Sequence, residues 1–392
     1  MQPTQTETAL IRRDRGVDTQ LLALVIALAA AGFVMMGSAS MDYAAEQYGN
    51  PFHHIVRHGI YLTLGAGALW VTLQVPVRVW EHAGASLLVV GMVILALLLV
   101  PGIGREVNGA TRWIGFGPVN LQPSELMKLF FVVYLAGYMT RRQYEVQNRW
   151  KGMFKPLGLL VLVVGLLLLE PDFGAAVVIS GTAMAMLFIG GARLLQFGVL
   201  LALGLGAAAV VAVWSPYRLQ RLVTFLDPWS EQFGGGYQLT QALIAFGRGE
   251  LLGVGLGNSV QKLFYLPEAH TDFVFAIIAE ELGLVGCVAF IALFAALIAR
   301  IMRIGSEAAQ RQQTFPAYVC FGIALLTAAQ VFINIGVNAG LLPTKGLTLP
   351  FLSYGGSSLL ILFAMMGRVL RIEREMRSAP VAAAAPWRLR HA

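Results

Sequence analysis

The stretch 21–37, LLALVIALAAAGFVMMG, carries no charged side chain. A helix that crosses the roughly 30 Å hydrocarbon core of a bilayer needs about 20 mostly apolar residues, and this stretch approaches that length. The preceding Arg12, Arg13 and Arg15 would also suit a secretory signal peptide, as would the small residues 38–40. Because the apolar part of a signal peptide usually has about 7–15 residues, we interpret 21–37 as a retained first membrane span.

Similar apolar stretches recur along the chain. They are continuous rather than alternating with a period of two, which favours helices over a β-barrel. The ten stretches begin near Thr19, Ile55, Ala83, Glu125, Pro156, Gly174, Leu194, Phe273, Pro316 and Pro350. The sequence therefore predicts an all-α polytopic membrane protein: a bundle of about ten transmembrane helices over 19–372, between short cytoplasmic tails at 1–18 and 373–392.

The overall composition agrees with this interpretation. Hydrophobic residues make up 57% of the 392 residues and charged residues 12%, against roughly 45–50% and 25% in ordinary globular chains. The mean hydropathy is +0.70. A soluble protein of this size would not cover its surface with so few charges, so a set of soluble domains is excluded.

The positive charge of the chain is best explained by membrane topology. The net charge is +7, which in a soluble protein would suggest nucleic-acid binding. In a ten-span model with both termini in the cytoplasm, most of the 28 Lys and Arg residues fall on the cytoplasmic side, as the positive-inside rule requires. No nucleic-acid partner is expected. Cys287 and Cys320 both lie in apolar runs, which is typical of buried small side chains.

Two long segments face the outside in this model, namely 101–124 and the large loop 215–272 between spans seven and eight. Within the loop, Leu239, Leu243 and Phe246 recur at helical spacing and predict a helix lying on the membrane surface, or a structural lid. The glycine-rich run 253–258 either wraps a phosphate with its N–H groups or only forms turns. The outer segments also hold a set of cationic side chains: Arg105, Arg112, Arg218, Arg221, Arg248, Lys262 and Lys345.

Ionisable side chains within or beside the spans are costly and are therefore candidates for function. Glu125 and Lys128 share one helix face and either pair with each other or line a polar cavity. Glu280 and Glu281, about 12–13 Å along a straight helix from Asp272, are expected near mid-membrane, either as a proton or cation site or as buried structural groups.

Asn334 and Asn338 lie one helical turn apart in span nine. Such a pair more often joins helices than binds substrate.

Asp272 ends a polar run, Glu268–Asp272, directly before an apolar stretch. Its carboxylate is expected at the outer interface, near a helix N-terminus. It acts there either as a helix cap or first-turn acid or as a general base for a bound hydroxyl group. No second carboxylate lies close in sequence, so the pattern favours transfer to a hydroxyl over a hydrolase pair.

Several longer motifs resemble the bacterial SEDS family (shape, elongation, division and sporulation). They are YQLTQA at 237–242, AFGRGE at 245–250, GLGNSVQK at 255–262, LPEAHTDF at 266–273, QPSELMK at 122–128 and PFLSYGGSS at 350–358. The residues DPW at 227–229 and PTKGL at 343–347 fit the division (FtsW) branch better than the elongation (RodA) branch. Ala279 is a small departure, because glycine is frequent there.

The resemblance implies a peptidoglycan glycosyltransferase that polymerises lipid II at the outer face of the bacterial cytoplasmic membrane and releases undecaprenyl diphosphate. It implies a catalytic role for Asp272. Together with the outer cations, it predicts substrate-binding residues at Arg112, Trp113, Gln122, Ser124, Glu125, Lys128, Arg218, Arg248, Lys262, His270, Lys345 and Ser353.

The resemblance also implies partners: a class B penicillin-binding protein, FtsI, the FtsQ–FtsL–FtsB complex and other divisome proteins at the division septum. No cofactor is evident in the sequence, although Mg2+ or Mn2+ is a family expectation without a visible ligand cluster. A lipid II flippase and a non-catalytic division scaffold are the alternative functions.

Overall fold

The computed structural model describes residues 16–107, 110–116, 119–213, 224–344 and 346–378. Helices dominate, and their bounds are α2 (Thr19–Tyr48), α3 (His53–Gln74), α4 (Val77–Leu98), α5 (Pro123–Arg141), α6 (Gln143–Asn148), α7 (Lys151–Leu169), α8 (Phe173–Ile189), α9 (Leu194–Val213), α11 (Tyr237–Gly249), η1 (Gln261–Tyr265), α12 (Val274–Gln310), α13 (Thr314–Asn338) and α14 (Gly356–Ser378).

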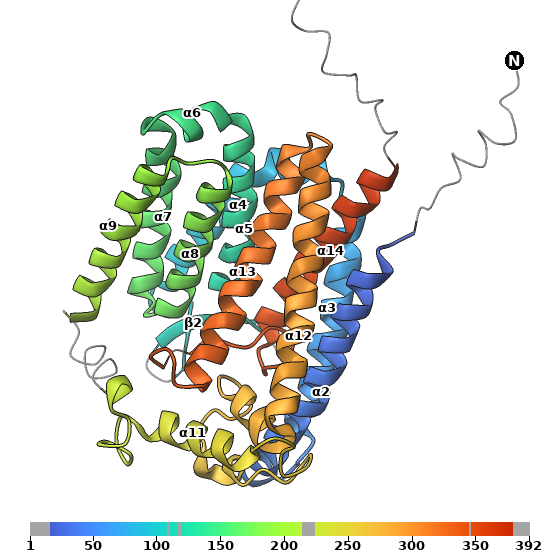
Figure 1. Cartoon of the computed structure of the whole chain (residues 1–392), viewed down its shortest axis with the longest axis vertical. Helices are drawn as coiled ribbons and strands as arrows, with labels where there is room; N and C mark the ends of the chain where they lie inside the picture. Colours follow the sequence, from blue (N-terminus) through green and yellow to red (C-terminus); the bar gives the residue numbers. More distant parts are fainter. Residues whose placement is uncertain (1–15, 108–109, 117–118, 214–223, 345, 379–392) are drawn as a thin grey trace, which may run out of the picture.

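The long helices form one bundle, with α5 and α13 in the middle, α2, α3, α12 and α14 on one side and α7, α8 and α9 on the other (Figure 1). The start of α2 and the end of α14 lie at the same end of the bundle, as an even number of crossings requires. The opposite end carries α11 and the strands, and we call it the α11 end.

Each predicted apolar stretch contains one of the long helices, and the prediction of an all-α polytopic membrane protein is confirmed. Three helix starts differ from the predicted ones by five residues or more. Helix α7 begins at Lys151, and Pro156 lies inside it. Helix α4 begins at Val77, directly after Pro76, because proline favours a helix start. Helix α14 begins at Gly356 because the chain before it is irregular, with φ +64° at Phe351.

Five of the described helices are long and apolar enough to cross a membrane by length and composition alone, namely α2, α4, α7, α12 and α13. Helix α5 carries Glu125, Lys128 and Arg141, and α14 carries charges along its second half. The count of ten crossings therefore stays a prediction.

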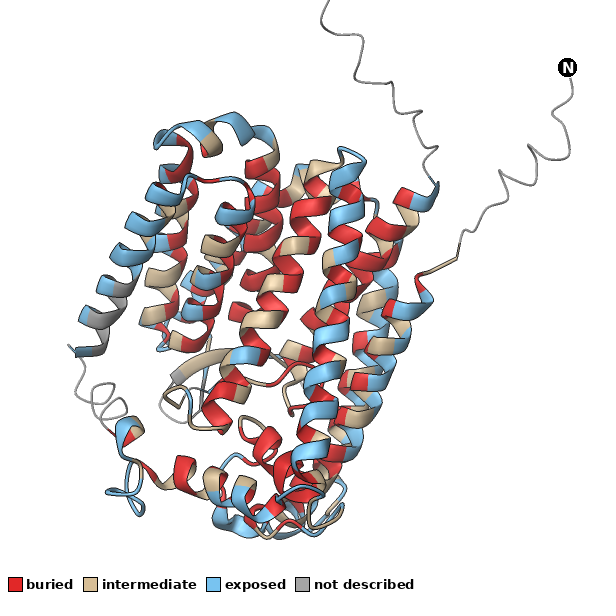
Figure 2. Ribbon diagram, viewed as in Figure 1, coloured by how far each residue is buried: buried red, intermediate tan, exposed pale blue. Residues whose placement is uncertain are grey.

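The outer faces of the helices carry large apolar side chains. Trp70 is 62% exposed, Val161 71% and Leu195 74%, and Figure 2 shows exposed faces along the outer helices. Exposed apolar side chains of this number are typical of a surface covered by lipid.

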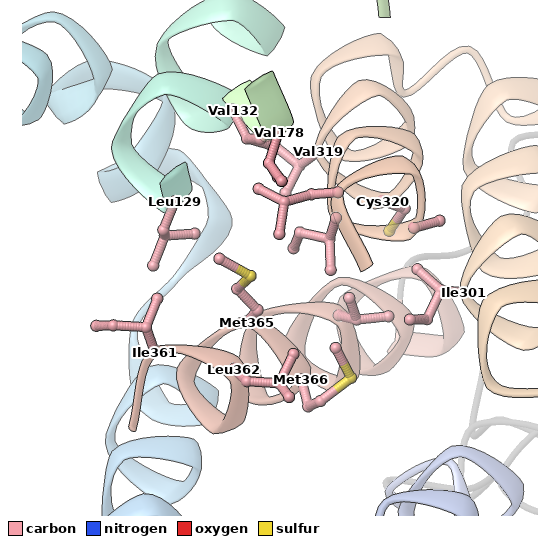
Figure 3. Packing of buried hydrophobic residues seen from close by; sticks show 14 of the residues in the cluster. Leu129, Val132, Val178, Ile301, Val319, Cys320, Ile361, Leu362, Met365 and Met366 are labelled. Atoms are coloured by element: carbon pink, nitrogen blue, oxygen red, sulfur yellow. The ribbon is translucent and has the colours of Figure 1, made fainter. Parts of the chain in front are cut away.

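The core lies between α5, α8, α12, α13 and α14, where the side chains of Leu129, Val178, Ile301, Val319 and Met366 meet (Figure 3). Helices α3 and α14 approach each other closely through glycine. A Cβ atom at Gly367 would lie 2.3 Å from Leu69 O. Small residues allow such approach between membrane helices.

A small antiparallel sheet, β1-β2-β3, lies in the segment that the sequence analysis described only as an outer loop. Its strands are β1 (Arg105–Val107), β2 (Ala110–Phe116) and β3 (Val119–Leu121). Arg105 is paired with Trp113 and Ile114 with Leu121. Because β3 runs directly into Pro123 and α5, the sheet fixes where that helix starts.

Helix α12 is interrupted at Gly283, which has φ +64°, a conformation that favours glycine. The segment 250–255 pairs with the backbone on both sides of the break. Val254 N–H donates to Glu280 O and Leu284 N–H to Glu250 O. The helix therefore has two parts, 274–282 and 284–310, and the loop completes the hydrogen bonds that the break leaves open.

Candidate active site

Asp272 lies directly before α12 at the α11 end. The N-cap residue of that helix is Phe273, and no acidic residue stands in its first turn. The expectation that Asp272 is the helix cap or a first-turn acid is therefore wrong. Its side chain is half-buried, and a Cβ atom at Gly346 would lie 3.0 Å from Asp272 Oδ2. The carboxylate thus lies beside the segment 346–347.

The backbone of Asp272 is held by two side chains of α13. The Nδ2 groups of Asn334 and Asn338 both donate to Asp272 O, at 2.9 Å each. This pair joins helices, as expected from its spacing, and neither amide is left to bind substrate by its N–H groups.

A second polar cluster surrounds Asp172, which the sequence analysis did not single out. Asp172 Oδ1 accepts the Ala175 N–H and caps α8. Its Oδ2 accepts from Ser124 Oγ at 2.7 Å and from Gln122 Nε2 at 3.1 Å. Two of the predicted site residues, Gln122 and Ser124, are therefore brought together around one carboxylate.

Arg112 on β2 reaches the same turn. Its Nε donates to Glu170 O at 3.2 Å and its Nη2 to Pro171 O. The guanidinium therefore fixes the turn between α7 and α8. Trp113, next on the strand, is half-buried.

This cluster adjoins the Asp272 segment. A Cβ atom at Gly174, in the first turn of α8, would lie 2.9 Å from Leu347 Cδ2. The chain 346–347 therefore lies between Asp272 on one side and the start of α8 on the other, and it links the two clusters.

Glu170 is a buried carboxyl group at the end of α7, and its Oε1 has no hydrogen-bond partner among the described residues. Burial, reinforced by the Asp172 charge and opposed by Arg112, raises the pKa of Glu170 to about 8. The group is therefore largely protonated at neutral pH.

This raised pKa predicts a pH-dependent stability. Unfolded Glu170 ionises near its ordinary pKa, whereas folded Glu170 stays neutral up to about pH 8. The contribution of Glu170 to the free energy of unfolding is fully present below its ordinary pKa and is lost as the pH rises toward 8. The melting temperature of Glu170→Gln should therefore equal that of wild type at pH 4.5. At pH 8 its free energy of unfolding should exceed that of wild type by about 1 kcal/mol or more. Equal pH profiles of the melting temperature would contradict this assignment.

Glu125 and Lys128 form a buried ion pair, with Lys128 Nζ 2.7 Å from Glu125 Oε2. Lys128 is only 1% exposed. The structure therefore shows the pairing that the sequence allowed, and it joins one turn of α5 to the next.

Arg248 and Lys262 are paired with the two glutamates of α12. Arg248 Nη1 lies 2.9 Å from Glu280 Oε1, and Lys262 Nζ 3.1 Å from Glu281 Oε1. Glu280 also accepts from Ser259 Oγ.

These pairs show the structural alternative for both glutamates, because each carboxylate holds the segment 248–262. Lys262 is 8% exposed and its ammonium group is held in one of these pairs, and its predicted substrate contact stays a prediction. Arg248 keeps an exposed fraction of 42% at its side chain.

Contacts in the loop also favour one of the two alternatives for its helix and for its glycine-rich run. The apolar face of α11 packs on protein rather than on the membrane surface: Leu239 is 2% exposed, and the rings of Phe246 and Phe275 are 6.0 Å apart. In the glycine-rich run, Gly253, Val254 and Gly255 donate their N–H groups to carbonyls of the protein. That run forms turns.

His270 and Ser353 lie in two segments that a backbone hydrogen bond joins. The Tyr354 N–H donates to His270 O, and Ser353 Oγ accepts the Leu349 N–H. The His270 ring lies 4.9 Å from that of His54. Burial lowers the pKa of His270 to about 4, so this imidazole is neutral at pH 7.

Arg218 and Lys345 lie outside the described residues. In the described ranges, no group of three or more His, Cys, Asp or Glu side chains is arranged to hold a metal ion.

The comparisons with known proteins agree with this architecture. A family model described as "Cell cycle protein" (FTSW_RODA_SPOVE) matches residues 18–378. The chain belongs to this family. A relative from Pseudomonas fluorescens, named probable peptidoglycan glycosyltransferase FtsW, is 56% identical over 93% of this chain and 90% of its own length. One from Coxiella burnetii with the same name is 55% identical over 91% and 96%.

Solved structures of the family share the fold. A chain from a study of the structural coordination of polymerization and crosslinking by a peptidoglycan synthase complex has a TM-score of 0.74 and 32% identity, covering 92% of this chain and 98% of that one. The rod shape determining protein RodA of Thermus thermophilus has a TM-score of 0.67 and 30% identity, covering 92% and 97%. The FtsW/RodA membership thus extends across nearly the whole chain.

Proposed function

We propose that this multi-pass membrane protein is a peptidoglycan glycosyltransferase that polymerises lipid II into glycan strands. The observation that carries the proposal is the placement of Asp272: its backbone is clamped by two asparagines and its carboxylate lies beside the segment 346–347. Relatives named FtsW, 55–56% identical to this chain, support the assignment.

In the proposed reaction, Asp272 accepts the proton of the acceptor sugar's 4-hydroxyl group while that oxygen attacks the anomeric carbon of the donor. The bond from the anomeric carbon to the phosphate oxygen breaks. Undecaprenyl diphosphate leaves with the electron pair, and the anomeric centre is inverted. A base contributes to such a transfer only within hydrogen-bond reach of the hydroxyl group, which is why a fixed carboxylate matters.

The leaving diphosphate needs cationic partners. Arg248 is the described candidate with an exposed guanidinium, and Arg218 and Lys345 remain predictions. Arg112 holds the turn at 170–171 and contributes positive charge there. The described side chains do not form a site for the Mg2+ or Mn2+ that the family leads one to expect, and no step is assigned to a metal ion.

The test is purified protein, with and without its partner transpeptidase, given lipid II and scored for glycan chains. Polymer from the purified protein supports the proposal. Movement of labelled lipid II across liposomes without polymer would instead identify a flippase. A protein with neither activity would fit the scaffold alternative. Ten spans and the charges of Glu280, Glu281 and Lys128 are compatible with the flippase alternative, and each of these three side chains is held in an ion pair.

We further propose that the α11 end faces the outside of the cytoplasmic membrane and that both termini are cytoplasmic. In this orientation the protein acts at the division septum with FtsI and the FtsQ–FtsL–FtsB complex. The chain from the peptidoglycan synthase complex, similar over 92% of this chain, supports assembly with a penicillin-binding protein.

A further inference from the structure

Asn334 and Asn338 connect three segments of the candidate active site. Both are nearly or fully buried, at 2% and 0% exposure. Besides the bonds to Asp272 O, Asn334 Nδ2 donates to Leu347 O and Asn338 Nδ2 to Asn334 O. Each amide nitrogen has two N–H groups, so both are fully used.

The acceptor side of Asn338 completes the bridge. Its Oδ1 accepts the Ala276 N–H at 3.0 Å, a group that also donates to Phe273 O. The N-cap residue of α12, Phe273, has no side chain that accepts such a bond. Asn338 therefore adds from α13 a side-chain acceptor for the first turn of α12, while its Nδ2 holds the carbonyl of Asp272.

These contacts set the position of the Asp272 carboxylate from two sides. Its own backbone is held through the carbonyl oxygen, and the facing segment is held through Leu347 O, one residue after Gly346. We propose that Asn334 and Asn338 are positioning residues that align the Asp272 carboxylate with the segment 346–347. The inference rests on the proposed role of Asp272 as the base.

Removing either asparagine leaves backbone groups of the site without a partner, which lowers stability. A purely structural role therefore predicts a lower melting temperature with unchanged turnover of the folded protein. Both asparagines, however, direct donors at the residue proposed to react, and a displacement of about 1 Å at a reacting group costs up to about a hundredfold in rate. The prediction is thus a loss of turnover in the folded protein in addition to any loss of stability.

The experiment uses the full-length protein with its partner transpeptidase and lipid II. The variants are Asn334→Ala, Asn338→Ala and Asn338→Gln, which keeps the amide but moves it by one methylene group. The control is Thr327→Val, a buried residue of the same helix whose hydroxyl bonds only within α13, to Ile323 O. The measurements are kcat, KM for lipid II, the melting temperature and hydrogen exchange of the Ala276 amide.

We expect both alanine variants to lose about tenfold or more in kcat with KM changed less than about twofold. Asn338→Gln should retain more activity than Asn338→Ala, and Asn338→Ala should exchange the Ala276 amide faster. Faster exchange with unchanged kcat would overturn the inference, as would losses matched by Thr327→Val. An Asn338→Ala protein that does not fold leaves Asn338→Gln and Asn334→Ala as the deciding variants.

The outcome separates this inference from the proposed function. An active Asp272→Asn protein would reject the assignment of Asp272 as the base, and the positioning role of Asn334 and Asn338 would fall with it. An inactive Asp272→Asn protein together with fully active Asn334 and Asn338 variants would support the base assignment and reject only the positioning role.

Discussion

Purified Asp272→Asn protein is expected to make no measurable glycan chains from lipid II, a loss of at least about a hundredfold. Asparagine keeps the size of the side chain but cannot accept the proton of the attacking hydroxyl group. The fold should survive, because Asp272 is held through its backbone carbonyl by Asn334 and Asn338. The measurement is chain formation by protein whose melting temperature stays close to that of wild type.

Glu268→Gln is the matched control. Glu268 lies four residues earlier, is exposed, and bonds Thr271 Oγ1 at 2.7 Å. It should polymerise lipid II at a rate close to wild type. Normal glycan chains from folded Asp272→Asn protein would reject the assignment of Asp272 as the base. An inactive Glu268→Gln protein would show that loss of either negative charge from this segment lowers activity.

The second large effect is expected at the pair that attaches the outer loop to α12. Lys262→Met should destabilise the protein by about 3 kcal/mol or more, because it leaves Glu281 buried without its cation. Glu281 is 0% exposed and would keep only its bonds to Ser38 Oγ and the Ser259 N–H. The measurements are thermal unfolding and protease cleavage within 248–265.

Arg248→Met provides the comparison on the neighbouring glutamate. The Arg248 side chain is 42% exposed, so water and salt screen its pair with Glu280. Glu280 is buried but keeps hydrogen bonds from Ser259 Oγ and from the N–H groups of Val260 and Gln261, so a loss of about 1 kcal/mol or less is expected. Equal losses from Lys262→Met and Arg248→Met would contradict the view that burial sets the strength of the attachment.

The helices of this protein were predictable because apolar runs of membrane length leave few alternative structures. The sheet at 105–121 was not, because β1 and β3 span only three residues each and carry no clear alternation. Asp272 was found because a polar run ends abruptly at an apolar one.

Other parts of the site depend on contacts between distant residues. The cationic partners of Glu280 and Glu281 lie 32 and 19 residues away in sequence, and Ser38, which also contacts Glu281, lies 243 residues away. Asp172 was missed since it stands alone in a short turn, although an acidic residue directly before an apolar helix is a recognisable cap signal. Its contact with Ser124 spans 48 positions, beyond the reach of local patterns.

The break in α12 also has a mechanical consequence. The long part, 284–310, is joined to the short part that begins beside Asp272 through one glycine and through backbone bonds borrowed from 250–255. A neighbouring helix that tilted the long part would therefore first strain its hydrogen bonds to the outer loop, which also carries Arg248, with Gly283 as the hinge. The stiffness of this joint depends on these backbone bonds, so a tilt of the long part reaches the Asp272 segment through Gly283 and through the loop together.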